Sequence, residues 1–116
     1  MTHTVTLLAD HKGYTRPRVV GDEYMVDANI NITSYTEDGE IITASSLGLS
    51  TITAVVITGA EVASGVALER FVVELNSDGD YESTSSFALV GTTASSGAES
   101  GNSDLGIVRV RVYGLI

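Results

Sequence analysis

Apolar and polar residues alternate along much of the chain with a period of two. The clearest example runs from residue 24 to residue 33, where every even position is apolar: Tyr24, Val26, Ala28, Ile30 and Ile32. Of the odd positions in this run, only Met25 is apolar. Because successive side chains of a β-strand point to opposite faces, this pattern predicts a strand with one buried face and one solvent-exposed face.

The same alternation returns near the C-terminus, where Val108, Val110 and Val112 are separated by Arg109 and Arg111. It predicts a second strand with arginines on its outer face. Apolar or β-branched runs predict further strands at residues 5–8, 18–20, 40–43, 52–57, 67–76 and 81–90. The run at 52–57 becomes apolar on both faces by its end, which favours a more central strand.

Glycine-containing turns separate several of these runs. Asp78-Gly79 lies between the runs at 67–76 and 81–90, and Asp38-Gly39 lies between the run at 24–35 and the run at 40–43. Glycine supplies the positive φ that a tight hairpin requires, so both dipeptides predict hairpin turns.

Helical and loop signals are sparse. Residues 44–49 predict one short helical turn, which Ser45 or Ser46 could cap and Gly48 would end. Residues 92–104 are rich in Ser, Gly and Ala and predict a long loop. About seven short strands therefore predict an all-β protein, a small antiparallel β-sandwich or barrel with at most one short helical turn.

Composition adds an expectation about assembly. A chain of 116 residues predicts a single β-domain spanning residues 1–116. Hydrophobic residues make up 43% of the chain and the mean hydropathy is +0.21, which is apolar for a small core to enclose. We therefore expect some apolar surface and some edge strands to meet another chain, most simply in a homo-oligomer.

Charge and cysteine content exclude several function classes. Six basic residues against fifteen acidic ones give a net charge of −9, so we expect no nucleic-acid partner and no binding to anionic membranes. Without cysteine there is neither a disulfide nor a thiolate metal site. The first residues show no basic region and no apolar run, so we expect no signal peptide and synthesis in the cytoplasm.

One acidic segment is a weak calcium candidate. Oxygen-bearing side chains alternate there at Asn76, Asp78, Asp80 and Glu82. Alternating oxygen ligands wrap calcium in known loops, but such a loop needs glycine at its sixth position, where this chain has Tyr81. An ordinary acidic hairpin turn is favoured, and we expect no metal and no cofactor.

Catalytic patterns are not apparent. His3, Asp10 and His11 lack the spacing of a metal site, and no serine stands in a nucleophile-elbow motif. Neighbouring carboxylates such as Asp22 and Glu23 are common in so acidic a chain and do not define a cleft. We therefore expect no catalytic residues and no enzymatic activity.

Arg16, Arg18, Arg109 and Arg111 hold four of the six basic side chains. On an acidic protein they are interface candidates, because arginine binds carboxylates of a neighbouring subunit well. The alternative is pairing with carboxylates of the same chain. The sequence leaves both interpretations open.

Residues 39–57 resemble small structural proteins of tailed bacteriophages. The shared pattern is a Gly39-Glu40 turn, a short strand, a Leu47-Gly48-Leu49 turn and an Ile/Val-rich strand, over about a sixth of the chain. The ending at residues 107–114 is also similar. Several such proteins are capsid decoration, or cement, proteins, which are β-rich and often trimeric. The resemblance implies a virion protein that binds the major capsid protein on the outer surface of the mature head.

Three other functions compete with this one. A tail, knob or fibre component would belong to the same virion class. A host-binding module would recognise surface glycans through its β-sheet loops, although the absence of tryptophan disfavours it. A small hydrolase would depend on Asp78, Asp80 or His11.

Overall fold

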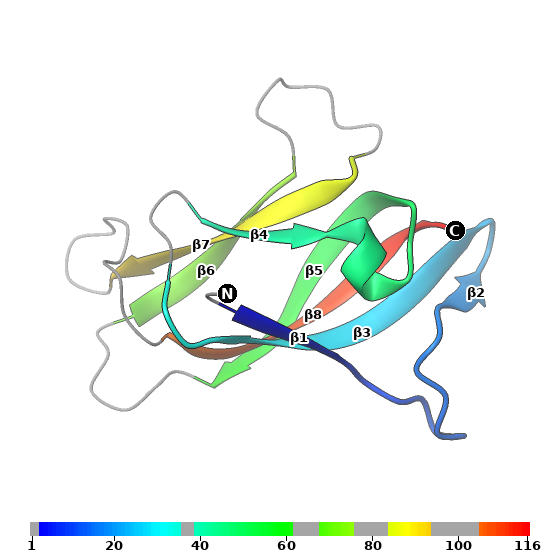
Figure 1. Ribbon diagram of the computed structural model, residues 1–116, viewed down its shortest axis with the longest axis horizontal. Helices are drawn as coiled ribbons and strands as arrows, with labels where there is room; N and C mark the ends of the chain where they lie inside the picture. The colour runs from blue at the N-terminus through cyan, green and yellow to red at the C-terminus, as the bar shows by residue number, and fades with distance from the viewer. Residues whose placement is uncertain (1–2, 36–38, 62–67, 76–83, 94–104) are drawn as a thin grey trace.

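The computed structural model describes residues 3–35, 39–61, 68–75, 84–93 and 105–116. Within these ranges the chain forms eight β-strands and one 3-10 turn (Figure 1). In chain order they are β1 (His3–Leu7), β2 (Arg18–Val20), β3 (Glu23–Ile32), β4 (Glu40–Thr43), η1 (Ala44–Leu47), β5 (Thr51–Glu61), β6 (Leu68–Glu74), β7 (Ser86–Thr93) and β8 (Gly106–Leu115). The prediction of an all-β fold with one short helical turn is confirmed.

The first sheet has five antiparallel strands. Its path is β1-β3-β8-β5, and β2 also pairs with β3. β1 lies against residues 28–32 of β3 and β2 against residues 23–25, so the two short strands share the edge that faces away from β8. β3 and β8, the two most regular alternating runs of the sequence, are therefore the interior strands of this sheet.

Alternation in β3 and β8 places their apolar residues on one face. Val26, Ala28, Ile30 and Ile32 are at most 2% exposed, and the three valines of β8 are fully buried. The register pairs Ala28 with Val110 and Ile30 with Val108, so the buried residues lie side by side across the two strands. Cross-strand apolar pairs of this kind stabilise a sheet and fix its register.

The second sheet has three antiparallel strands in the order β4-β7-β6. Phe87 and Leu89 of β7 and Ile42 of β4 are buried on its inner face. Phe71 and Val73 of β6 are partly buried and pack against the same core. The predicted strands around Phe71 and Phe87 are thus confirmed, and they pair with each other as expected.

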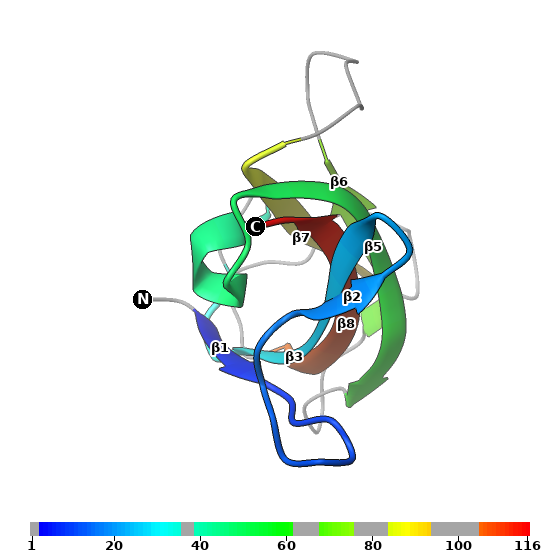
Figure 2. The ribbon, with the colours of Figure 1, turned by 90° about the vertical axis from the view of Figure 1, so that its right-hand side faces the viewer.

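The inner faces of the two sheets enclose one hydrophobic core. Its buried members are Val26, Ala28, Ile30, Ile32, Tyr35, Ile42, Ala44, Leu47, Leu49, Ile52, Phe87, Leu89, Leu105, Val108, Val110 and Val112. Viewed from the end at which β2 lies, the strands of the two sheets curve around a common interior (Figure 2). Since burying one large apolar side chain contributes about 1.5–3 kcal/mol, this cluster is the main source of stability.

Backbone hydrogen bonds join the sheets at one end. Ile52 and Thr84 form an isolated antiparallel bridge, with N–O distances of 2.6 and 2.9 Å. The amide of Ala44 donates to the carbonyl of Ser85 at 2.8 Å and extends the β4–β7 ladder up to this bridge. The fold is therefore a β-sandwich whose two sheets are bridged where β5 begins.

The position of β5 differs from the prediction of a more central strand. β8 separates β5 from β3, so β5 is the last strand on its side of the sheet. Val55 and Ile57 pack against the core, whereas Val56 is 49% exposed on the outer face. The run looked apolar on both faces because a valine stands at an outward position of an edge strand.

The hairpin predicted at Asp38-Gly39 is also wrong. The strand before it, β3, belongs to the first sheet, whereas β4 pairs with β7 in the second. Gly39 has a φ of +113°, which glycine adopts without strain, at the point where the chain enters β4. The Asp78-Gly79 turn lies outside the described residues.

Two local boundaries differ from the sequence prediction as well. Ser45 and Ser46 lie inside η1 and do not cap it, because Thr43 precedes the turn. Gly48 ends the turn with a φ of +79°, as predicted. Thr92 and Thr93 belong to β7, so the segment predicted as a loop from residue 92 begins within a strand. None of the helical structure in the described ranges is long and apolar enough to cross a membrane.

Candidate functional site

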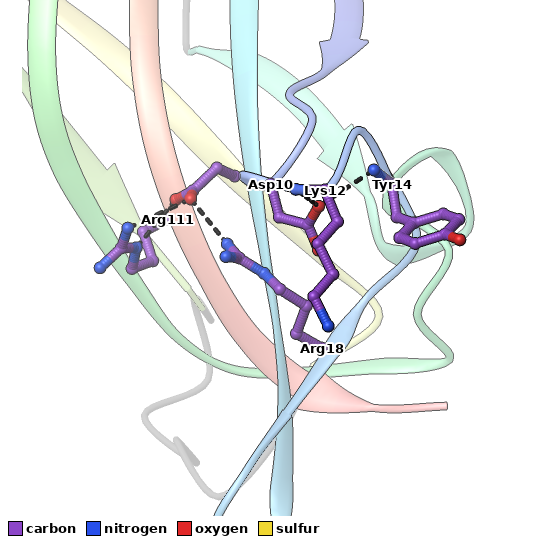
Figure 3. A network of polar contacts seen from close by, with 6 residues as sticks. Asp10, Lys12, Tyr14, Arg18 and Arg111 are labelled. Carbon is purple, nitrogen blue, oxygen red and sulfur yellow. Dashed lines mark hydrogen bonds and ion pairs between the residues drawn. The ribbon is translucent and has the colours of Figure 1, made fainter.

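The outer face of the five-stranded sheet carries a buried carboxylate. Asp27 lies on β3 directly opposite Arg111 of β8, and its side chain is only 7% exposed. Arg111 donates from Nε to Asp27 Oδ1 at 2.8 Å and from Nη2 to Oδ2 at 3.1 Å. Arg18 of β2 donates from Nη2 to the same Oδ2 at 3.0 Å. Figure 3 shows Arg18 and Arg111 approaching this group from two different strands.

These contacts fix the charge state of the pair. The hydrogen bond from Arg111 is the largest cause that lowers the pKa of Asp27, and the nearby charges of Arg18 and Arg109 act in the same direction. In return, the hydrogen bond to Asp27 raises the pKa of Arg111. Asp27 is therefore ionised at neutral pH and serves to hold β2, β3 and β8 together; a general acid would need a pKa near the working pH.

Arg109 lies on β8 two residues before Arg111, and it is opposite Asn29 of β3. Asn29 is neutral, and Arg109 is exposed and forms no ion pair with any carboxylate among the described residues. Both residues line an open groove of about 360 Å³. Its lining residues are Asn29, Thr58, Gly59, Ala60, Glu61, Ile107 and Arg109.

The loop between β1 and β2 is organised by Asp10. Its Oδ1 accepts hydrogen bonds from the backbone amides of Lys12 at 2.8 Å and Tyr14 at 3.0 Å (Figure 3). The bond from Tyr14 is the largest cause that lowers the pKa of Asp10. The guanidinium carbon of Arg16 lies 4.8 Å from the centre of the Tyr14 ring, a cation–π contact. Asp10 therefore acts as a loop-capping residue.

His3 and Glu40 form a contact between the two sheets. His3 Nδ1 of β1 lies 2.6 Å from Glu40 Oε1 of β4, and the Glu40 side chain is 1% exposed. This contact fastens the edge of the first sheet to the edge of the second. Of the three residues considered as metal ligands in the sequence, His3 contacts Glu40, whereas Asp10 and the adjacent His11 lie in the loop between β1 and β2. Within the described ranges no three His, Asp or Glu side chains gather as a metal site would require.

The outer face of the three-stranded sheet carries a small apolar patch beside the exposed residue Glu74, which lies opposite Ala88. Ile41 of β4 lies opposite Ala88 of β7, and Val90 of β7 lies opposite Val72 of β6. Ile41 is 54% exposed and Val72 is 40% exposed. We call these four residues the apolar face. Exposed apolar surface of this kind marks contacts with other chains when it is contiguous.

The four predicted interface arginines therefore have three different surroundings. Arg18 and Arg111 bind Asp27 of the same chain, as the alternative interpretation of the sequence proposed. Arg16 stacks on Tyr14, and Arg109 stands in the groove. The calcium candidates Asn76, Asp78, Asp80 and Glu82 lie outside the described residues.

Sequence reasoning missed Asp27, Asn29 and Glu40. Asp27 and Asn29 occupy polar positions of the strand pattern, which marks them only as outward-facing. Their roles depend on which residue of β8 lies opposite, across a sequence separation of 84 residues for Asp27 and Arg111. No local signal carries that register.

Together these features define a small all-β sandwich with an arginine–aspartate network on one outer face and a small apolar patch on the other. No known family model matches the chain, and no curated protein or solved structure is similar to it.

Proposed function

We propose that the chain is a structural protein of a tailed-phage virion, a decoration protein that binds the major capsid protein on the outer surface of the mature head. The resemblance over residues 39–57 supports this proposal. In the structure that segment forms β4, η1 and much of β5, which meet where the two sheets are bridged. The segment therefore forms a central part of the fold. Related structural proteins would share such a part.

The apolar face carries the proposal. Ile41 and Val72 expose large side chains to solvent on a chain whose net charge is −9. A surface of this kind suits contact between copies of the chain, because burying it removes apolar area from water. We propose a homo-oligomer, a trimer, formed through this face.

Such an oligomer would stabilise a head by mass action. A protein that binds only the mature lattice lowers the free energy of that lattice relative to the dissociated shell. Many copies across capsomer junctions would multiply a modest contact energy. No catalytic step is required for this function.

Oligomer mass and head binding test the proposal. Light scattering should give three times the chain mass of 12.1 kDa, and bare heads of the phage that encodes the chain should bind it. Ile41→Glu and Val72→Glu should dissociate the oligomer, whereas Val56→Glu should not, because Val56 is similarly exposed but lies on the other sheet.

Two outcomes would overturn the proposal. One is a wild-type monomer that fails to bind heads. The other is an electron-microscopy map of the virion without its density on the head. A few copies per particle, measured by gel densitometry of purified virions, would instead favour a tail, knob or fibre component.

A further inference from the structure

Two arginines lie on the same outer face of β8 but have different partners on β3. Arg111 lies opposite Asp27 and is bound to it through two hydrogen bonds. Arg109 lies opposite Asn29, whose amide carries no charge. In the described part of the chain no carboxylate lies within 4.0 Å of the Arg109 guanidinium. Arg109 thus projects from the same face of β8 as Arg111, but it has no carboxylate opposite it on β3.

The surroundings of Arg109 are suited to receive one. Arg109 and Asn29 line an open groove of about 360 Å³, with the end of β5 from Thr58 to Glu61 as its wall. Thr58 Oγ1 donates to the backbone carbonyl of Arg109 at 3.3 Å, which holds this wall against β8. A guanidinium presents several N–H donors in a planar fork, and the Asn29 amide adds further donor capacity beside it.

We propose that this groove binds a carboxylate side chain presented by a neighbouring protein chain. The carboxylate would take, opposite Arg109, the role that Asp27 has opposite Arg111. An open groove encloses too little of a small metabolite to hold it well, whereas a side chain that projects from a protein surface needs no enclosure. The inference deepens the proposed function, on which it rests for the identity of the neighbour as another virion chain.

Glu61 sets the orientation of the incoming group. It lines the same groove and lies opposite Ile107, two residues from Arg109 along β8. A second carboxylate is repelled by Glu61, so the ligand should approach from the Asn29 side of the groove. Glu61→Gln should therefore strengthen binding, by about twofold for an exposed charge pair.

Rebinding to bare heads gives the first test. Arg109→Gln and Asn29→Asp should each weaken binding of the full chain about fivefold, since an exposed to half-exposed charge pair contributes on this scale. Asn29→Asp is the sharper variant because it retains the arginine and occupies it with an internal carboxylate. Arg16→Gln is the matched control, because it removes an exposed arginine outside the groove. Thermal unfolding should confirm that all three variants fold.

A peptide titration gives a test that is independent of the head. The probe is a blocked pentapeptide, Thr-Val-Glu-Val-Thr, followed by amide and arginine side-chain chemical shifts of the isotope-labelled full chain. Shifts should concentrate at Arg109 and at residues 58–61. They should be lost with the Gln peptide and with Arg109→Gln, and they should grow with Glu61→Gln. Acetate alone should bind more weakly than the peptide.

The two tests separate the inference from the proposed function. If heads bind wild type and Arg109→Gln equally, and the Glu and Gln peptides behave alike, the groove has no role and head decoration still stands. If heads do not bind the wild type but the peptide shifts appear, decoration fails and the carboxylate site stands. Acetate binding as tight as the peptide would overturn the protein-chain ligand in favour of a small-anion site.

Discussion

Two adjacent cross-strand pairs of β3 and β8, here called rows, differ by a single functional group. In one row Asp27 and Arg111 face each other, and in the next row Asn29 and Arg109 do. Exchange of a carboxylate for an amide makes the first arginine part of an internal ion network and leaves the second available to other molecules. Both arginines are outward-facing residues of one alternating strand, so position in the strand does not determine their roles. The residue across the ladder does.

The first row also makes a contact with β2, which is a weakly attached strand. β2 has only three residues and pairs with β3 alone. Arg18 of β2 donates to Asp27, so the Asp27 carboxylate links β2 to β3 and, through Arg111, to β8. The second row has no equivalent link. We therefore expect substitutions in the first row to change stability and substitutions in the second to change binding.

Asp27→Asn should produce the largest difference between the rows. The amide leaves two guanidinium groups without their anion at a site where the Asp27 side chain is 7% exposed. Because both arginines are about one-third exposed, water compensates part of this loss, and we expect a decrease of about 2 kcal/mol in the free energy of unfolding. Urea denaturation measures it.

Asn29→Ala is the control for that substitution. It removes an uncharged side chain from the neighbouring row and should change the free energy of unfolding by less than about 0.5 kcal/mol. Equal losses in the two variants would show that the Asp27 network adds nothing beyond ordinary side-chain packing.

The two arginines give a matched pair with a smaller effect. Arg111→Gln removes the two-bonded partner of Asp27 but leaves Arg18, so we expect a loss of about 1 kcal/mol. Arg109→Gln removes an arginine without an ion-pair partner in the described chain, and its effect should stay within about 0.5 kcal/mol. Urea denaturation of the two proteins under one buffer compares them directly. A larger loss for Arg109→Gln would refute the assignment of the groove as an open site.

The pH dependence follows from the lowered pKa of Asp27. Its ordinary value is 3.8, and the hydrogen bond from Arg111 holds the folded value below this. A depressed carboxyl pKa contributes stability that is fully present above the unfolded pKa and is lost as the pH falls through the folded one. The stability advantage of wild type over Asp27→Asn should therefore be constant between about pH 5 and 7 and shrink below about pH 4.

Comparing wild type with Asp27→Asn also removes the contribution of Asp10 to the pH dependence of stability. The pKa of Asp10 is lowered too, by the Tyr14 amide, so wild type alone would show a combined acid transition. Denaturation of both proteins at pH 7 and at pH 3 isolates Asp27. An advantage that persists unchanged at pH 3 would contradict an ionised, bonded Asp27.

Local patterns in the sequence were sufficient to predict the strands. The even residues from Val26 to Ile32 and the valines of β8 are buried because a strand has a period of two, and this property requires no knowledge of the partner strand. Gly48 ends η1 for a similarly local reason, its positive φ. The fold class followed from the number of such segments.

Long-range pairing could not be predicted in the same way. A glycine turn at Asp38-Gly39 fits a hairpin, but the chain uses Gly39 to pass between sheets. The edge position of β5 depends on β8, which is about fifty residues later in the chain. The roles of Arg109 and Arg111 depend on register in the same way. Outward-facing arginines were visible in the sequence, but the carboxylate opposite one and the amide opposite the other were not.

Asn29→Asp makes the second row resemble the first, and it carries the smallest expected effect. The new carboxylate stands opposite Arg109 and should form an ion pair with it. Because the site is open to solvent and β2 supplies no second arginine there, we expect a gain of only about 0.5 kcal/mol in the free energy of unfolding at neutral pH. Urea denaturation of Asn29→Asp, Arg109→Gln and the double variant forms a closed cycle.

The cycle decides whether the groove arginine can reach a carboxylate at all. If the gain from Asn29→Asp disappears in the Arg109→Gln background, the guanidinium accepts an anion at this position, and a carboxylate from another chain can occupy the same place. If the gain is independent of Arg109, the new charge interacts with other groups. In that case the two rows differ in more than one functional group, and the case for an external carboxylate at Arg109 fails with the comparison.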